Sequence, residues 1–286
     1  MLKEIVFLIG DESQMSAIEQ MKKNFGKDGD KVITGKLPRT ESGQAAYDKG
    51  NTLFVTDEEE TLQALKQNGY YAIALLHEKN KEQDLSAALY AITDIEELTF
   101  DSFAMAYMRL SGKPWTIMET KRCIIREMTV EDVDAFYQIY KEPSITFYME
   151  DLFEEPEEER EYTREYIKKI YSFYGYGLWS IVGKESETVI GRAGISWREG
   201  FDIPELGFVI AVPYQHKGYA YEVCRAILDY GKEELGFDKV QALVKKDNEA
   251  SIRLCTRLGF VRIDSVEDKG KEYERYVVED FLCASP

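Results

Sequence analysis

The stretch VPYQHKGYAYEV, residues 212–223, joins an apolar lead-in to a polar loop with one glycine and then to the start of a helix. Several backbone N–H groups at a helix start have no partner within the helix, and the helix dipole adds about half a positive charge there. Gly218 lets a ligand approach this backbone closely. The pattern predicts a receptor for phosphate oxygens, although one glycine in such a loop is more often typical of an ordinary turn.

A second stretch, NEASIRLCTRLGF at residues 248–260, has the form of one short helix with both caps. Asn248 is a favourable N-cap, and Gly259 can adopt the left-handed conformation that ends a helix. Steps of three and four residues predict one inward face. This face carries Ser251, Leu254, Cys255 and Leu258, and the opposite side carries Arg253 and Arg257. The pattern leaves open whether Cys255 is packing or chemistry.

Together the two stretches resemble the GNAT acetyltransferases. Gln215-x-x-Gly218-x-Ala220 matches the Q/R-x-x-G-x-G/A pattern of that superfamily, and the helix from Asn248 follows at the family's spacing. The N-x-x-S start and L-G-F ending of that helix extend the match, which covers roughly residues 121 to 280. The strand that begins Glu205-Leu-Gly-Phe resembles the branch that includes the ribosomal-protein N-acetyltransferases.

The resemblance implies acetyl-CoA as co-substrate and no metal. The strand holding Ile210 and Val212 would pair with the pantetheine arm like an added strand, and the amides of residues 215–220 would cradle the pyrophosphate. His216 stands where the family often has glycine, a departure that leaves the amides intact, and Lys217 is also typical of a solvated charge. The implied cofactor-binding residues are Ile210, Val212, Gln215, His216, Lys217, Gly218, Tyr219, Ala220, Asn248 and Ser251.

The implied reaction is direct attack of an unprotonated amine on the acetyl thioester. It needs a base for the ammonium proton, backbone donors for the oxyanion, here near Ile210, and an acid for the thiolate. Glu205 is the candidate base, provided that its pKa is raised; an ordinary strand-end carboxylate is the alternative. Cys255 stands where many family members have tyrosine, which makes it a candidate acid. Its other interpretations are packing, with water or another tyrosine as the acid, and a nucleophile that forms an acyl-enzyme. We favour packing because free cysteines are usually buried and no histidine partner is apparent.

The acceptor is expected between the first two helices of this region and the neighbouring strands. We predict an aromatic cleft with an acidic rim, suited to a small-molecule amine or a protein N-terminus that arrives as a cation. Core aromatics and solvated acids explain the same residues equally well. The substrate candidates are Phe147, Tyr148, Glu150, Trp179 and Trp197, with Asp151 beside them.

A second hypothesis is a CoA-binding or regulatory module that no longer catalyses. The altered acid position at Cys255 and the presence of a further domain motivate it. Catalysis is the hypothesis we favour, because intact phosphate-binding loops usually accompany turnover.

Composition excludes several classes of function. The chain of 286 residues has a formal net charge of −17, so we expect neither nucleic acid nor a membrane as partner, because both are recognised through basic patches. The four cysteines, Cys123, Cys224, Cys255 and Cys283, form no C-x-x-C pair, which argues against structural zinc and a disulfide framework. The apolar run at the start is too short for a signal peptide, so we expect a cytoplasmic protein. A homodimer is left open.

Residues 1–112 alternate short apolar runs with helical stretches, which predicts parallel strands with crossover helices in a small Rossmann-like α/β domain. Residues 51–76 resemble a strand-helix-strand unit of haloacid-dehalogenase-like hydrolases. Such enzymes need a second carboxylate two positions after the first, and none follows Asp11 at that spacing. We therefore interpret Asp11 and Asp57 as turn and N-cap residues and this domain as a non-catalytic binding or assembly module.

Residues 113–121 contain a Ser-Gly-Lys-Pro break and are expected to be a linker, followed by a GNAT domain over residues 122–286. The apolar rhythm there predicts a strand, two helices with a stop at Pro143, a three-stranded antiparallel meander, and then helix, strand, helix and two strands. The expected fold class is α/β (α+β), with a mixed, mostly antiparallel sheet and flanking helices.

Overall fold

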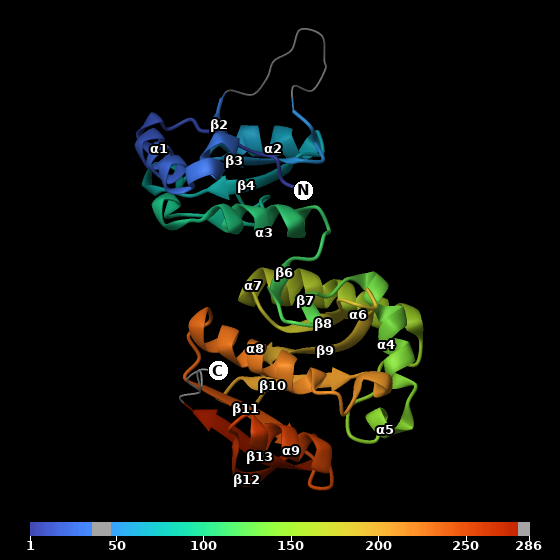
Figure 1. The fold of residues 1–286 in the computed structure, drawn as a ribbon. Coiled ribbons are helices and arrows are strands. Elements are labelled where there is room, and N and C mark those ends of the chain that lie inside the picture. Colours follow the sequence, from blue (N-terminus) through green and yellow to red (C-terminus); the bar gives the residue numbers. More distant parts are fainter. Residues whose placement is uncertain (36–46, 280–286) are drawn as a thin grey trace. The chain divides into compact units, whose positions relative to one another are not determined.

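The computed structural model describes residues 1–35 and 47–279, so Cys283 lies outside the described residues. The chain divides into two compact units, Met1–Trp115 and Thr116–Pro286 (Figure 1). Among the described residues, no helix is long and apolar enough to cross a bilayer.

The first unit contains a five-stranded sheet in the order β2-β1-β3-β4-β5, and all its pairings are parallel. Its strands are β1 (Glu4–Leu8), β2 (Val32–Thr34), β3 (Thr52–Thr56), β4 (Tyr71–Leu75) and β5 (Ala91–Ile92). Helices α1 (Met15–Asn24) and α3 (Phe100–Leu110) cover one face, and α2 (Glu59–Gln67) covers the other. The predicted parallel α/β layer is confirmed, and its central strands are almost wholly buried because both faces are covered.

Two aspartates that follow strands of this unit, Asp11 after β1 and Asp57 after β3, accept hydrogen bonds from backbone N–H groups. Asp11 caps a short 3-10 turn by accepting the Ser13 N–H at 3.1 Å. Asp57 is 2% exposed and accepts the N–H groups of Gly10 and Asp11 at 2.7 and 3.0 Å, with His77 Nε2 at 3.0 Å. Asp11 thus has the cap role expected for it. Asp57 caps no helix, because Glu58 precedes α2, and it instead joins the segment after β1 to His77, a long-range contact that its sequence position did not indicate.

The second unit contains an eight-stranded sheet in the order β12-β13-β11-β10-β9-β8-β7-β6. Its strands are β6 (Thr116–Glu119), β7 (Cys123–Glu127), β8 (Leu178–Gly183), β9 (Val189–Ser196), β10 (Glu205–Ile210), β11 (Lys239–Val244), β12 (Val261–Asp268) and β13 (Lys271–Glu279). The predicted meander is confirmed, because β8, β9 and β10 pair antiparallel in sequence. The pair β10 and β11 is parallel, so the sheet is mixed and mostly antiparallel, as expected.

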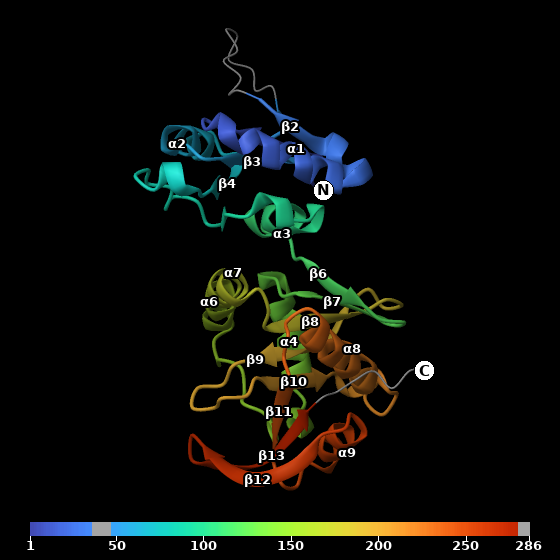
Figure 2. The same ribbon diagram turned by 90° about the vertical axis from the view of Figure 1, so that its left-hand side faces the viewer.

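Helices cover both faces of this sheet. They are α4 (Val133–Tyr140), α5 (Pro143–Thr146), α6 (Pro156–Tyr166), α7 (Ser172–Tyr174), α8 (Tyr219–Glu233) and α9 (Glu249–Arg257), with a π-helical turn at Ile167–Tyr171. Helices α8 and α9 share the larger core, whereas α4 and α5 pack around Val209; Figure 2 shows α8 and α9 on the same side of the sheet. Pro143 begins α5, because a proline at the first helical position sacrifices no hydrogen bond.

Part of the segment expected to be a linker is a strand. Residues 116–119 form β6, which pairs antiparallel with β7 at the edge of the sheet. Ile117 and Met118 pack against the core of the second unit. Two apolar residues in a four-residue strand give too short a pattern to be distinguished from a linker in the sequence.

Candidate functional site

The site begins where β10 and β11 separate. These parallel strands share a single paired position, Glu205 opposite Gln241, where the Gln241 N–H donates to the Pro204 carbonyl at 2.8 Å. Beyond it, β10 pairs with β9 as far as Ile210 but no longer with β11. The opened edge of β10 can therefore accept an extended ligand in the manner of an added strand.

A cavity of about 500 Å³, the loop cavity, lies between the end of β10, the loop before α8, and α9. Of the predicted cofactor-binding residues, seven line it: Ile210, Gln215, His216, Gly218, Ala220, Asn248 and Ser251. Val212, Lys217 and Tyr219 do not line this cavity. Val212 begins a short 3-10 turn after β10 rather than continuing the strand.

The loop itself has the conformation of an anion-binding helix start. His216 and Gly218 both adopt left-handed backbone conformations, with φ of 58° and 82°, which explains why glycine suits the position of His216. The first hydrogen bond within α8 runs from the Glu222 N–H to the Gly218 carbonyl. The preceding N–H groups are therefore free of helical bonds and can donate to a phosphate.

Arg122, just before β7, holds this loop from behind. Its guanidinium donates to the Lys217 carbonyl at 2.9 Å and to Glu222 Oε2 at 2.7 Å, and it lies 3.9 Å from the centre of the Tyr219 ring. The Arg122 N–H also donates to Glu222 Oε1 at 2.8 Å. Lys217 and Tyr219 thus support the shape of the loop, a role that the sequence pattern did not reveal.

Two arginines of α9 also line the loop cavity. Arg253 and Arg257 were predicted to lie on the side away from Ser251, yet all three face this cavity, because it opens along the edge of the helix. The Arg257 guanidinium lies 3.9 Å from the centre of the Tyr221 ring. Such guanidinium groups suit phosphate ligands.

Helix α9 has the caps predicted for it, and Cys255 points into the core. Asn248 Oδ1 accepts the Ser251 N–H at 3.1 Å, and Gly259 adopts φ of 95°. Cys255 is fully buried beside Leu258 and lines neither of the cavities described here. Burial raises the pKa of the Cys255 thiol to about 12. This placement agrees with the packing interpretation.

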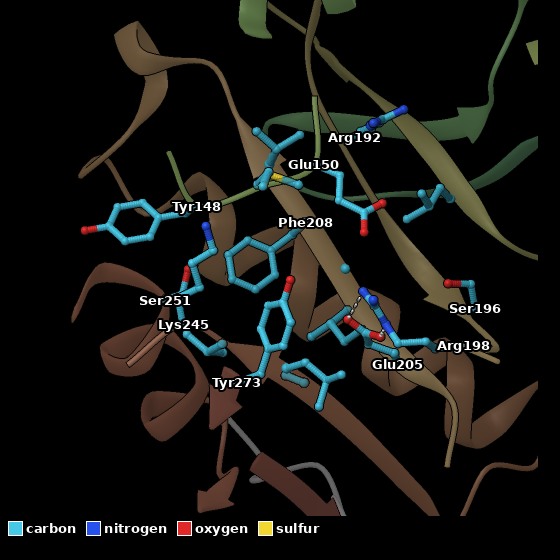
Figure 3. A pocket seen from close by; sticks show the side chains of 18 of the residues that line it. Tyr148, Glu150, Arg192, Ser196, Arg198, Glu205, Phe208, Lys245, Ser251 and Tyr273 are labelled. Atoms are coloured by element: carbon cyan, nitrogen blue, oxygen red, sulfur yellow. Dashed lines mark hydrogen bonds and ion pairs between the residues drawn. The ribbon is translucent and has the colours of Figure 1, made fainter. Parts of the chain in front are cut away.

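A second cavity of about 440 Å³, the Glu205 cavity, lies on the other side of the strand opening (Figure 3). Its walls come from β9, β10, β11, the segment after α5 and the β12–β13 turn. Six residues line both cavities and so mark where they meet: Tyr148, Met149, Phe208, Val209, Asn248 and Ser251.

Glu205 is a buried carboxylate in this cavity. It is 9% exposed and forms an ion pair with both Nε and Nη2 of Arg198, which in turn donates to Asp268 Oδ2 at 2.6 Å. Burial raises the pKa of Glu205, and the Arg198 guanidinium partly offsets that rise. A carboxylate in this state can accept and release a proton nearer to neutral pH than an exposed one.

Tyr273 of β13 places a phenol in the same cavity. It is 8% exposed, and burial raises its pKa. Its hydroxyl has no hydrogen-bond partner among the residues that the structure describes. Tyr273 lies far from Glu205 in sequence, so no local pattern pointed to it.

The predicted acceptor residues are only partly brought together. Tyr148, Glu150 and Trp197 line the Glu205 cavity. Phe147 is 61% exposed and lines neither cavity. Trp179 is fully buried and packs edge-on against Tyr230 of α8, 5.7 Å between ring centres, so it belongs to the core.

The rim of this cavity is mixed in charge rather than acidic. Four basic side chains, Arg192, Arg198, Lys245 and Lys269, line it together with three acidic ones, Glu150, Glu199 and Glu205. Within the described parts of the chain, no group of His, Cys, Asp and Glu side chains is arranged to hold a metal.

Comparison with known proteins gives the same family. The model of the acetyltransferase (GNAT) domain matches residues 122–261. YkkB of Bacillus subtilis is 32% identical over 143 residues, which cover 47% of this chain and 80% of YkkB. The uncharacterized N-acetyltransferase p20 of Bacillus licheniformis is 28% identical over 162 residues, which cover 55% of this chain and 89% of p20. The family match begins at residue 122 and gives no support to the haloacid-dehalogenase resemblance of the first unit.

Solved structures agree on the fold. The ribosomal-protein-S5-alanine acetyltransferase of Vibrio fischeri superposes with a TM-score of 0.50 at 14% identity, over 58% of this chain and 98% of that one. At this identity the likeness concerns the fold alone. Together with the family match, it completes the identification: the chain belongs to the GNAT family of N-acetyltransferases.

Proposed function

We propose that the second unit transfers an acetyl group from acetyl-CoA to a primary amine. The observation that carries this proposal is that two cavities meet at the strand opening. The loop cavity has phosphate-binding amides and arginines, and the Glu205 cavity holds a buried carboxylate. The loop cavity suits a diphosphate with an extended arm, and the Glu205 cavity suits a small amine.

The residues present suit acetyl-CoA, which supplies an activated thioester when bound. The amides before Glu222 would hold the pyrophosphate, with Arg257 close by. The opened edge of β10 would pair with the pantetheine arm. Asn248 and Ser251 line both cavities and would lie beside the arm.

Glu205 would accept the ammonium proton of the acceptor, directly or through water, and its raised pKa suits that role. Tyr273 is our candidate for the general acid that donates a proton to the leaving thiolate. It would replace the tyrosine that many family members have at the position of Cys255. Its hydroxyl lies in the same cavity without a partner among the described residues, whereas Cys255 is enclosed in the core.

The acceptor is a primary amine of a small molecule or of a protein N-terminus. The Glu205-Leu-Gly-Phe strand resembles the ribosomal-protein branch, which is why protein N-termini stay within the proposal. The comparisons do not favour the alternative of a non-catalytic CoA-binding module, because p20 and other relatives are named N-acetyltransferases.

The test measures thiol release from acetyl-CoA across a panel of amines. Glu205→Gln should lower kcat about 100-fold or more, and Tyr273→Phe about tenfold or more, with acetyl-CoA affinity unchanged. Cys255→Ala and Cys255→Ser should change kcat less than about threefold. Normal turnover by Glu205→Gln would contradict the assignment of the base, and a large loss in both Cys255 variants with the fold intact would return the acid role to Cys255.

A further inference from the structure

The floor of the Glu205 cavity is a bipolar strip of β9 and β10. In the antiparallel register Glu205 lies opposite Ser196, Gly207 opposite Gly194, and Val209 opposite Arg192. Alternation along the strands places these three pairs on one face of the sheet. The strip therefore carries a carboxylate at one end and a guanidinium at the other. Between them Gly207 lines the cavity beside the Leu178 side chain, whereas Gly194 is covered by the Gly177 backbone.

The two charged ends are far enough apart for a small ligand to lie between them. Arg192 and Ser196 are four residues apart on β9, which separates their Cα atoms by about 13 Å. Arg192 and Glu205 both line this cavity. Both side chains therefore border one space, and a single molecule that spans this space can contact both.

Arg192 has no acidic partner among the described residues. Its Nε and Nη2 atoms donate to the Tyr140 hydroxyl at 3.0 and 2.7 Å, and its guanidinium lies 4.9 Å from the Tyr140 ring centre and 5.3 Å from that of Phe136. None of the ion pairs in the described part of the chain includes Arg192. A guanidinium has five N–H donors, so this half-buried group keeps donors for a ligand.

The acidic side chains of the cavity differ in this respect. Glu205 is paired with Arg198, and Glu150 lies 3.6 Å from Lys269. Glu199 is exposed. The single positive charge of Arg198 is shared between Glu205 and Asp268. Two cationic side chains of the cavity, Arg192 and Lys245, have no acidic partner among the described residues, and Lys245 Nζ donates to the Phe147 carbonyl at 2.6 Å. In a chain with a net charge of −17, Arg192 is thus the guanidinium of this cavity that has no carboxylate to pair with.

We propose that the amine acceptor also carries a carboxylate, which Arg192 binds while the amine lies toward Glu205. Arginine and carboxylate pair through two parallel hydrogen bonds, and this pairing selects such a ligand over a neutral analogue. The inference rests on the proposed acetyl transfer and deepens it by naming the acceptor class. A free amino acid and a peptide N-terminus followed by an acidic residue share this chemistry.

The experiment compares matched acceptors that differ in one carboxylate. The first comparison is between free amino acids and their carboxamides. The second is between dipeptides with Glu and with Gln at the second position. Spermidine is included as a polycationic acceptor without a carboxylate. Thiol release from acetyl-CoA should show kcat/KM about tenfold or more higher for the carboxylate member of the preferred pair. Which comparison shows the preference distinguishes the two sources.

Variants of Arg192 then assign the preference. Arg192→Gln should lower kcat/KM for the carboxylate member about 10- to 100-fold, chiefly through KM, and change that of the neutral member less than about threefold. For the carboxylate member, Arg192→Lys should have a kcat/KM between that of the wild type and that of Arg192→Gln. Arg160→Gln, which breaks the ion pair between α6 and the exposed Asp134 side chain of α4, is the matched control and should behave as wild type. Unchanged acetyl-CoA affinity and melting temperature show that the variants are folded.

Two outcomes would overturn the inference while acetyl transfer stands. One is equal kcat/KM for both members of every pair, or a preference for spermidine; the other is an equal loss for both members in Arg192→Gln. If no amine releases thiol, the proposed function fails. Calorimetric titration of the CoA-saturated enzyme with the same pairs then still decides: carboxylate-dependent binding that Arg192→Gln removes supports the inference, and its absence overturns it.

Discussion

At the scale of single residues, the state of Glu205 depends on two neighbours with opposite effects. Burial raises its pKa, Arg198 lowers it, and Asp268 raises it. Only the deprotonated carboxylate can act as a base, so the proposed reaction should accelerate as pH rises through this pKa. The guanidinium of Arg198 thus positions Glu205 and, if Glu205 is the base as we propose, also influences the pH at which the reaction proceeds.

Removing each neighbour should shift the pH profile in opposite directions. In Arg198→Gln the Glu205 pKa rises further, so the acidic limb of kcat/KM moves to higher pH. In Asp268→Asn a charge that raises the pKa is lost, so the limb moves to lower pH. The measurement is kcat/KM against pH, with Lys269→Gln, which removes an exposed cation of the same cavity rim, as control. A shift of both variants in the same direction would contradict Glu205 as the titrating base.

At the scale of elements, the loop before α8 is shaped from outside itself. His216 and Gly218 adopt left-handed conformations, and Arg122, just before β7, donates to the Lys217 carbonyl and to Glu222. The amides that we propose to bind phosphate are thereby held in place before a ligand arrives, which reduces the ordering that binding would require.

Loss of this support should weaken coenzyme binding without altering the chemistry. Arg122→Ala is expected to raise the Kd for acetyl-CoA about tenfold, while kcat at saturating acetyl-CoA changes less than about threefold. The measurement is calorimetric titration together with saturation kinetics. Lys184→Ala breaks the ion pair with Glu119 at the neighbouring sheet edge and should leave Kd unchanged. A fall in kcat with an unchanged Kd would contradict this role.

At the scale of the whole molecule, each unit has a core of its own. The cores of the second unit contain no residue of the first, and both cavities are lined by the second unit alone. A domain with its own core can fold independently. The relatives p20 and YkkB match this chain over 89% and 80% of their own lengths, but these matches cover only 55% and 47% of this chain.

Residues 116–286 alone should therefore fold and turn over. We expect a single cooperative unfolding transition and a kcat/KM for acetyl-CoA within about threefold of the full chain. A matched fragment that begins at residue 122 lacks β6, which covers part of the core, and should unfold at a lower temperature. Loss of turnover by a folded 116–286 fragment would assign a catalytic contribution to the first unit.

Short-range patterns determined much of the fold and part of the site. The caps of α9 at Asn248 and Gly259, the meander from β8 to β10, the parallel layer of the first unit and the loop at residues 215–220 were predictable. Each depends on residues a few positions apart, whose backbone preferences act locally. The place of Glu205 at a strand start was predictable for the same reason.

Only the tertiary structure decided which side chains share the two cavities. Arg198 and Tyr273 come from separate segments and meet Glu205 through sheet register, while Arg192 reaches the same floor four residues along β9 from Ser196. Periodicity grouped Ser251 with Cys255 on one inward face, yet Ser251 lines a cavity together with Arg253 and Arg257, whereas Cys255 lies in the core. A sequence pattern states which residues share a face, whereas long-range packing decides what that face touches.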